Sequence, residues 1–357
     1  MLSRIDKLRA ELAARDLDAF LVTDILNVCY LSGFTGSTAV ALITKSDSIL
    51  ITDFRYAEQA ESECPGMRLQ LVESHWVAGA PRAIESSHAQ RIGFESHGLN
   101  FHDWTELSAV VSDVHFLAQD DLVGRLRYIK DDVEIGLIRE AVRIADLAYD
   151  HIAGVVKPGI EEREVALDLE HFMRRQGAEK EAFDSIVASG PRSALPHGKS
   201  SDRKIAVGDL VVIDFGAKCQ GYHSDITRTV MLGSPDDKQQ EVWNIVRDAQ
   251  EKAIAAVRPG VSGGEVDAIA REYITSRGHG EHFGHGLGHG LGLDVHDGRI
   301  LGRRSETVLE PGMVVTVEPG IYIPGWGGVR IEDDVLVTES GADILTKAPK
   351  TLGLGRP

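Results

Sequence analysis

Four acidic residues in the second half of the chain stand on two predicted β-hairpins. The first hairpin runs along an apolar strand from Asp209 to Asp214, turns near Cys219-Gln220, and returns through Asp225. If Cys219 and Gln220 form a two-residue turn, Asp214 lies directly opposite Asp225, with the Cβ atoms about 5 Å apart. Two carboxylates at that distance repel each other, and burial at the end of an apolar strand adds to the cost. A divalent cation between them would resolve both problems.

The second hairpin repeats this arrangement. Its outgoing strand, residues 313–317, ends at Glu318, and the returning strand reaches Glu332 after a turn rich in glycine and proline. A single carboxylate at a strand end is usually an exposed surface group. Four of them in two matching hairpins are better explained as ligands of a metal centre.

A glycine-rich segment between the two hairpins supplies imidazole groups. Five of the 14 histidines fall between residues 279 and 296, and glycine at this density lets the backbone approach a site closely. A single histidine is more often structural, and His279 and His282 are assigned to that class. Four carboxylates and one imidazole suit Mn²⁺, Co²⁺ or Zn²⁺ rather than a metal that prefers thiolates. The four charges match two divalent ions, which predicts a dinuclear site with bridging carboxylates and a hydroxide nucleophile.

At these positions the sequence resembles the pita-bread metallopeptidases, and within them the aminopeptidase P/prolidase branch. The resemblance extends over nearly the whole chain, from residues 27–36 and 52–56 to the second hairpin. It is carried by a combination that matches the five metal ligands of the family in order and context: Asp214, Asp225, His289, Glu318 and Glu332.

The resemblance implies a role for each of these five residues. Asp214, Asp225 and Glu332 would bind the ions through carboxylates, some of them bridging. His289 would bind one ion, and Glu318 would act both as a ligand and as a proton shuttle.

Four more residues match positions that the family uses around its substrate. His197 matches a histidine that faces the scissile amide, and His296 matches one that stabilises the carbonyl oxygen as it becomes an oxyanion. His285 matches a histidine of the substrate pocket, and Arg330 an arginine near the bridging glutamate.

The activity implied by the resemblance is hydrolysis of Xaa-Pro bonds at the N-terminus of short peptides by two metal ions, with manganese as the expected metal. A strict Xaa-Pro dipeptidase is the first alternative, because the sequence does not show whether the cleft is blocked beyond proline or holds a cation for the product carboxylate. A methionine aminopeptidase is a less favoured alternative, because those enzymes generally lack the creatinase-like N-terminal domain. A metal-free creatinase-like enzyme or a non-catalytic binding module is a further alternative, although such proteins lose ligand residues.

An internal repeat indicates how the two hairpins are placed. The segment from Val156 to Val165 recurs from Val257 to Val266 at an offset of 101 residues, and Gly177 maps onto Gly278. In each copy, a predicted helix precedes a Pro-Gly turn, a second helix follows it, and sequence rich in strands comes next. A duplication of this kind predicts two similar half-domains that bury a site between them.

The chain before the repeat predicts a separate α/β domain. Strands are expected at residues 19–22, 40–43, 48–51 and 91–95, the middle two as a hairpin, with a helix face at residues 8–12. Asp131-Asp132 predicts the N-cap of a long helix through Asp150. We therefore expect a creatinase-like α/β domain over residues 1–128 and an α+β pita-bread catalytic domain with a pseudo-two-fold repeat over residues 129–357.

Composition narrows the range of partners. The 357 residues include 55 Asp and Glu against 38 Lys and Arg, a formal charge of −17, which disfavours nucleic acid and anionic membranes. No apolar run is long enough to span a membrane, and three widely spaced cysteines fit a reducing cytoplasm. The N-terminal resemblance implies dimer contacts, so the expected state is a homodimer that acts on proline-containing peptides.

Overall fold

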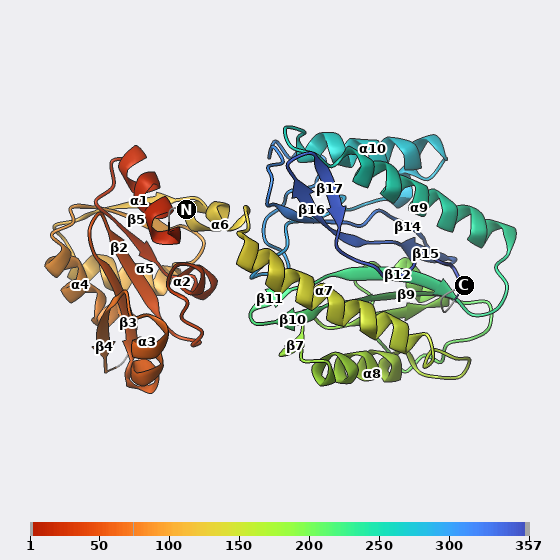
Figure 1. Cartoon of the computed structure of the whole chain (residues 1–357), viewed down its shortest axis with the longest axis horizontal. Helices are drawn as coiled ribbons and strands as arrows, with labels where there is room; N and C mark the ends of the chain where they lie inside the picture. The colour runs from red at the N-terminus through yellow and green to blue at the C-terminus, as the bar shows by residue number, and fades with distance from the viewer. Residues whose placement is uncertain (1–2, 74, 354–357) are drawn as a thin grey trace. The chain divides into compact units, whose positions relative to one another are not determined.

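The protein, seen here as a computed structural model, is described over residues 3–73 and 75–353. Its internal contacts divide the chain into two compact units, one ending at Arg127 and the other beginning at Tyr128 (Figure 1). No helix in these described ranges is both long enough and apolar enough to cross a membrane.

The first unit is an α/β domain, as the sequence predicts, and its described residues form a mixed six-stranded sheet that includes two strands not predicted, β4 and β6. Its strand order is β4-β3-β2-β1-β5-β6, in which β2 and β3 form the predicted antiparallel hairpin. The strands are β1 Ala19–Val22, β2 Val40–Thr44, β3 Ser48–Asp53, β4 Arg68–Val72, β5 Arg91–Glu95 and β6 His115–Gln119. The helices are α1 Arg4–Ala14, α2 Ile25–Ser32, α3 Ala57–Glu63, α4 Ala80–Ser87, α5 Phe101–Val110 and α6 Leu122–Arg127, with 3₁₀ turns η1 Phe54–Tyr56 and η2 Trp76–Ala78.

Up to residue 353, the second unit has four α-helices and four small sheets. The helices are α7 Asp132–Ile152, α8 Glu162–Arg175, α9 Asp237–Ala256 and α10 Gly263–Ser276, with 3₁₀ turns η3 Gly190–Ala194 and η4 Gly280–His282. The strands of its first half are β7 Lys180–Glu181, β8 Ile186–Ser189, β9 Leu210–Phe215, β10 Ala217–Cys219, β11 Tyr222–His223 and β12 Ile226–Met231. Those of its second half are β13 Val314–Val317, β14 Gly320–Ile323, β15 Gly327–Arg330, β16 Asp333–Thr338 and β17 Gly341–Ile344.

The predicted repeat is present in the structure at the predicted offset. Helices α8 and α10 begin and end 101 residues apart, and each follows a longer helix, α7 or α9. The turn glycines Gly159 and Gly260 have φ of 89° and 84°, and Gly177 and Gly278 have φ of 105° and 83°. These values lie in the left-handed region that favours glycine, so the same turn geometry ends each helix pair.

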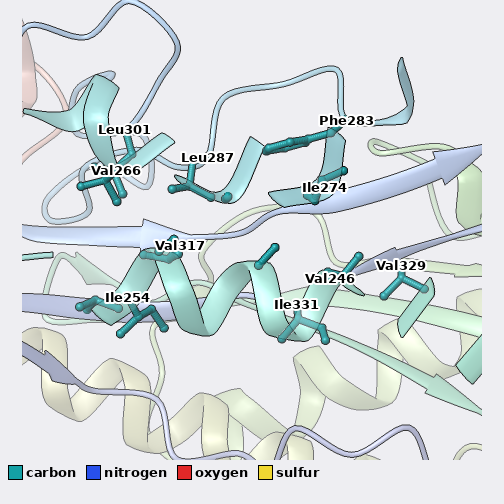
Figure 2. Packing of buried hydrophobic residues seen from close by; sticks show 14 of the residues in the cluster. Val246, Ile254, Val266, Ile274, Phe283, Leu287, Leu301, Val317, Val329 and Ile331 are labelled. Carbon is teal, nitrogen blue, oxygen red and sulfur yellow. The ribbon is translucent and has the colours of Figure 1, made fainter. Parts of the chain in front are cut away.

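Helices cover the strands of the second unit from two sides. Helices α7 and α8 pack together on one side and α9 and α10 on the other, with the strands between them (Figure 1). Figure 2 shows Val246 and Ile254 of α9 gathered with Val317, Val329 and Ile331 from the strand-rich second half. Because each buried aliphatic side chain contributes about 1.5–3 kcal/mol, this core fixes the strands that carry the acidic residues.

The register of the first hairpin differs from the prediction. The two-residue turn is Gln220-Gly221 instead of Cys219-Gln220, because Cys219 pairs with Tyr222. Both turn residues have positive φ, 47° and 85°, as a type I′ turn requires. The predicted turn began one residue too early, at Cys219, and left Gly221 outside the turn.

The correction moves the two aspartates of the first hairpin apart by two residues without changing their face. Asp214 pairs with Thr227, and Asp225 lies between β11 and β12, outside the paired residues. Because side chains alternate with a period of two, a shift of two residues keeps both carboxylates on one face as diagonal neighbours. In the second hairpin, Gly320 pairs with Arg330 and Val317 with Asp333, so the same register places Glu318 opposite Glu332.

The turn geometry generates a stability prediction. Gly221→Ala should lower the free energy of unfolding by about 1 kcal/mol, because alanine is strained at positive φ. Steric clash would not contribute, since the new Cβ would meet only Leu293 Cδ2, at 3.5 Å. Urea unfolding followed by circular dichroism would measure the change.

The matched control is Gly136→Ala in the exposed part of α7, where nothing lies within 4 Å of the new Cβ. This substitution should stabilise the protein by about 0.5–1 kcal/mol, since alanine favours helix. Two changes of the same sign would contradict the positive-φ account of the turn.

Candidate metal centre and cleft

A cleft of about 650 Å³ lies in the second unit. It is bordered by the two acidic hairpins, the glycine-rich segment and the loop that follows η3. The cleft is lined by all nine residues singled out in the sequence: His197, Asp214, Asp225, His285, His289, His296, Glu318, Arg330 and Glu332. The fold therefore brings together residues that are up to 135 positions apart in the chain.

Breaks in the strands place three of the four acidic side chains. Asp214 lies within β9, but Asp225 stands between β11 and β12, Glu318 between β13 and β14, and Glu332 between β15 and β16. At each break the chain leaves one small sheet and enters another. Donor atoms of Asp225, His289 and Glu332 lie within 4.8 Å of one another.

The imidazole of His289 faces two carboxylates with Nε2, the ring nitrogen that carries no hydrogen. Its Nδ1 lies 3.0 Å from the carbonyl oxygen of Gly290, which can only accept, so Nδ1 carries the hydrogen. Burial lowers the pKa of His289, which keeps the ring neutral. The Nε2 lone pair therefore points toward Asp225 Oδ2 at 3.6 Å and Glu318 Oε1 at 3.4 Å. Three acceptors in this arrangement repel one another unless a cation or a proton lies among them.

Several buried carboxylate oxygens also have no hydrogen-bond donor. These are Oδ1 of Asp214, Oδ1 of Asp225 and Oε1 of Glu332, and each parent residue is at most 8% exposed. The second oxygen of Asp214 accepts from Arg330 Nη2 at 2.5 Å, and that of Glu332 accepts from Thr227 Oγ1 at 2.7 Å. In Asp214 and Glu332, one carboxylate oxygen thus accepts a hydrogen bond that fixes the side chain, and the other oxygen is left to bind a cation. Oxygen ligands with one imidazole fit a hard or borderline divalent ion.

Mutual repulsion and burial shift the acid–base properties of the cluster. Burial, together with the charges of Glu332 and Asp214, raises the pKa of Asp225. Burial and the charges of Glu318 and Asp214 raise the pKa of Glu332 in the same way. Burial raises the pKa of Glu318 to about 8, although Arg330 opposes the shift. Without a bound cation, Glu318 therefore holds a proton at neutral pH.

Arg330 and Tyr322 connect the carboxylates to His285. Arg330 is 4% exposed and donates to Asp214, to Thr227 Oγ1 at 3.0 Å and to Tyr322 OH at 2.9 Å. His285 Nε2 lies 3.0 Å from the same hydroxyl, and burial lowers the pKa of His285 to about 4. Its Nδ1 lies 2.7 Å from the Gly286 carbonyl, so both ring nitrogens already have partners. The sequence did not single out Tyr322, because its role depends on contacts between distant segments.

The two remaining histidines are the exposed ones. The ring of His296 lies 4.4 Å from that of His289, and burial together with His289 lowers the pKa of His296. His197 lies on the loop after η3, where the preceding carbonyl, that of Pro196, accepts from Arg330 Nη1 at 3.0 Å. Both imidazoles can therefore reach a molecule in the cleft.

Two cations that the sequence did not single out also line the cleft. Lys199 and Arg299 are exposed there, beside apolar side chains that include Phe183, Ile186 and Leu301. Arg299 stands three residues after His296, and this short spacing was the available signal. Surface arginines and lysines are common, so sequence spacing alone did not distinguish these two.

Comparison with known proteins gives a consistent result over both units. Residues 136–339 match the model of metallopeptidase family M24, and residues 4–129 match that of the creatinase/prolidase N-terminal domain. A Xaa-Pro dipeptidase of Pyrococcus horikoshii is 42% identical over 355 residues, which cover 99% of this chain and 99% of that protein.

Two solved structures extend the comparison. A Xaa-Pro dipeptidase from Bacillus anthracis superposes with a TM-score of 0.95 at 46% identity over 98% of each chain. An X-Pro aminopeptidase from Thermotoga maritima has a TM-score of 0.87 at 41% identity, covering 95% of this chain and 97% of that one.

The raised carboxyl pKa values predict how the metal-free protein responds to pH. The pKa of Glu318, about 8 in the folded state, exceeds the ordinary 4.5. The folded state therefore binds this proton more tightly, and its contribution to stability is lost as pH rises toward 8. Histidines with lowered pKa act in the opposite direction only below about pH 6.5. After chelation, the free energy of unfolding should fall between about pH 6.5 and 8, by about 1–2 kcal/mol from Glu318.

Thermal unfolding of chelated protein across this interval measures the effect. Glu318→Gln serves as the control, since it removes one of the titrating groups and should flatten the decline. Stability that is constant or rising between pH 6.5 and 8 would contradict the shifted pKa values.

Proposed function

The chain belongs to metallopeptidase family M24, and we propose that it hydrolyses Xaa-Pro bonds of short peptides with two divalent metal ions held by Asp214, Asp225, His289, Glu318 and Glu332. The observation that carries the metal proposal is the lone pair of His289 facing two carboxylates. Relatives named for Xaa-Pro cleavage, aligned over nearly the whole chain, support the choice of substrate.

Asp214, Asp225 and Glu332 each have one buried carboxylate oxygen without a hydrogen-bond donor, and His289 presents the lone pair of Nε2. Four carboxylates bring four negative charges, which two divalent ions would neutralise. Once bound, such ions polarise a peptide carbonyl and make water nucleophilic at neutral pH. Manganese is the proposed metal, with cobalt or zinc as alternatives, because the donors are mostly oxygen.

Four side chains of the cleft have proposed roles in proton transfer, oxyanion stabilisation or ligand positioning. Glu318, whose pKa is high when no cation is present, is suited to accept a proton from the attacking water and to pass it to the leaving nitrogen. His296 and His197 are exposed to the cleft, where their N–H groups can donate to the carbonyl oxygen as negative charge develops on it. Arg330 holds Asp214 in place through a charge-assisted hydrogen bond.

The cations of the cleft favour a dipeptide as substrate. In a Xaa-Pro dipeptide the proline carries a free carboxylate, and Arg299 or Lys199 on the cleft lining can pair with it. A longer peptide has an uncharged amide at that point and gains nothing from these residues. We therefore propose a Xaa-Pro dipeptidase, with the Xaa-Pro aminopeptidase expected from sequence as the second candidate. A homodimeric state and a cytoplasmic location stay predictions from the sequence.

Replacing one ligand tests the metal proposal. Asp225→Asn removes a charge at the centre of the cluster while it keeps the shape of the side chain. Metal-dependent turnover should fall by more than about 100-fold, beyond the usual effect of an outer-sphere partner. Isothermal titration with Mn²⁺ and peptidase assays would measure both properties.

The matched control is Asp184→Asn, an exposed aspartate on the same cleft outside the proposed ligand set. It should bind Mn²⁺ as the unmodified protein does. Retained turnover and metal affinity in Asp225→Asn would refute the ligand assignment.

Two changes test whether the protein is a dipeptidase or an aminopeptidase. The first removes the carboxylate from the substrate, and the second removes Arg299, its proposed partner. The unmodified protein should cleave a Xaa-Pro dipeptide faster than the matching Xaa-Pro amide or Xaa-Pro-Xaa tripeptide. Arg299→Met should raise KM for the dipeptide by about tenfold, the loss expected for one charged hydrogen bond, and leave the amide unaffected.

Arg304→Met, an exposed arginine that does not line the cleft, is the control and should change neither substrate. Faster cleavage of the tripeptide would identify an aminopeptidase. No cleavage of any Xaa-Pro substrate with added Mn²⁺ would refute the proposed function.

A further inference from the structure

The loop that carries His197 has little regular structure of its own. It leaves β8 at Ser189, passes through the short turn η3, and reaches Ser201 without forming a strand. His197 itself is exposed at the cleft, so its own side chain cannot fix the position of the loop. The position of the imidazole must therefore be set by contacts of other parts of the loop.

One buried carboxylate holds both ends. Glu162, the first residue of α8, is 0% exposed and lies outside the proposed ligand set. Its Oε1 accepts from the backbone N–H of Ser189 at 2.8 Å and from the Ser189 hydroxyl at 2.7 Å. Its Oε2 accepts from the backbone N–H of Ser201 at 3.1 Å and from the Ser201 hydroxyl at 2.6 Å.

An arginine links this anchor to the middle of the loop. Arg192 donates from Nε to Glu162 Oε2 at 3.2 Å, and its Nη2 donates to the carbonyl oxygen of Lys199. At the cleft, the carbonyl of Pro196 accepts from Arg330. The loop segment with His197 is thus held at two places, by Glu162 and by Arg330, which also binds Asp214.

The second half of the unit holds its histidine loop by a similar arrangement. Asp267 on α10, 1% exposed, accepts from the backbone N–H of Leu287 at 3.0 Å and pairs with Arg271 at 2.7 Å. Arg271 donates to the carbonyl of His285 at 2.8 Å. The two anchors are not equivalent positions of the repeat, because Glu162 maps onto Gly263 at the offset of 101.

We propose that Glu162 is a positioning residue that fixes His197 for catalysis by holding Ser189 and Ser201 at the two ends of its loop. This inference rests on the proposed function, in which His197 donates to the substrate. Five donors converge on the two oxygens of Glu162, and none of its contacts is an acceptor. A carboxylate can accept from all five donors, whereas the amide of glutamine would turn its N–H groups toward a backbone N–H that cannot accept.

A double-mutant cycle separates positioning from a general effect on folding. Glu162→Gln should lower kcat by about 10- to 100-fold, as expected for a misplaced catalytic group. In a His197→Ala background the same change should lower kcat by less than about twofold, because the group it positions is gone. Equal losses in the two backgrounds, or no loss from Glu162→Gln alone, would overturn the proposal.

Two measurements keep the test independent of the reaction. In Glu162→Gln, hydrogen exchange of the backbone amides of residues 189–201 should speed up at least about tenfold, while Mn²⁺ affinity stays unchanged. Glu164→Gln, an exposed substitution of the same type on the same helix, is the matched control and should change neither. Unaltered exchange in Glu162→Gln would overturn the anchoring role.

Ser201→Ala covers the case in which Glu162→Gln does not fold. It removes one hydroxyl donor and leaves the carboxylate, so a smaller loss of kcat should again vanish in the His197→Ala background. A loss that persists there would overturn the proposal. If the unmodified, Mn²⁺-loaded protein cleaves no Xaa-Pro substrate, the proposed function is wrong. The hydrogen-exchange measurement would still test whether Glu162 holds the loop.

Discussion

The organisation of the second unit depends on one electrostatic constraint. The neutral imidazole of His289 presents a lone pair to Asp225 and Glu318, within a group of four carboxylates of which three are buried and Glu318 is partly buried. Such a group is repulsive by itself, and burial raises the pKa of Glu318 and Asp225. A fold that keeps these side chains together must hold each of them from behind and must leave their remaining donor atoms for a cation.

The two half-domains meet this constraint with parts that recur. Each contributes a helix pair, a hairpin with acidic residues and a buried core that fixes the strands. Behind the carboxylates, Asp334 accepts from the backbone N–H of Asp225 at 3.0 Å, and buried Arg228 pairs with Asp333 at 2.7 Å. Lys350 near the end of the described chain also contacts Asp333, at 2.5 Å. The ligands are thus supported by residues from several distant segments.

Short sequence motifs predict many of the elements, and they single out nine residues that line one cleft. The repeat offset, the capping of α7 at Asp131 and the strands of the first unit follow from spacing and from residue type. The register of the first hairpin does not, since it depends on which of two overlapping pairs, Cys219-Gln220 or Gln220-Gly221, forms the turn. The roles of Glu162 and Tyr322 were also not predicted, because each acts on backbone or side chains far away in the chain and neither belongs to a recognisable motif.

The central proposal is that His289 and the four acidic residues of the two hairpins form a dinuclear metal centre. The most direct measurement is anomalous diffraction at the manganese edge from crystals of protein reconstituted with Mn²⁺. The account predicts two peaks, both within bonding distance of the cluster formed by Asp214, Asp225, His289, Glu318 and Glu332. No peak, or a peak only at a place remote from Asp225 and His289, would contradict it.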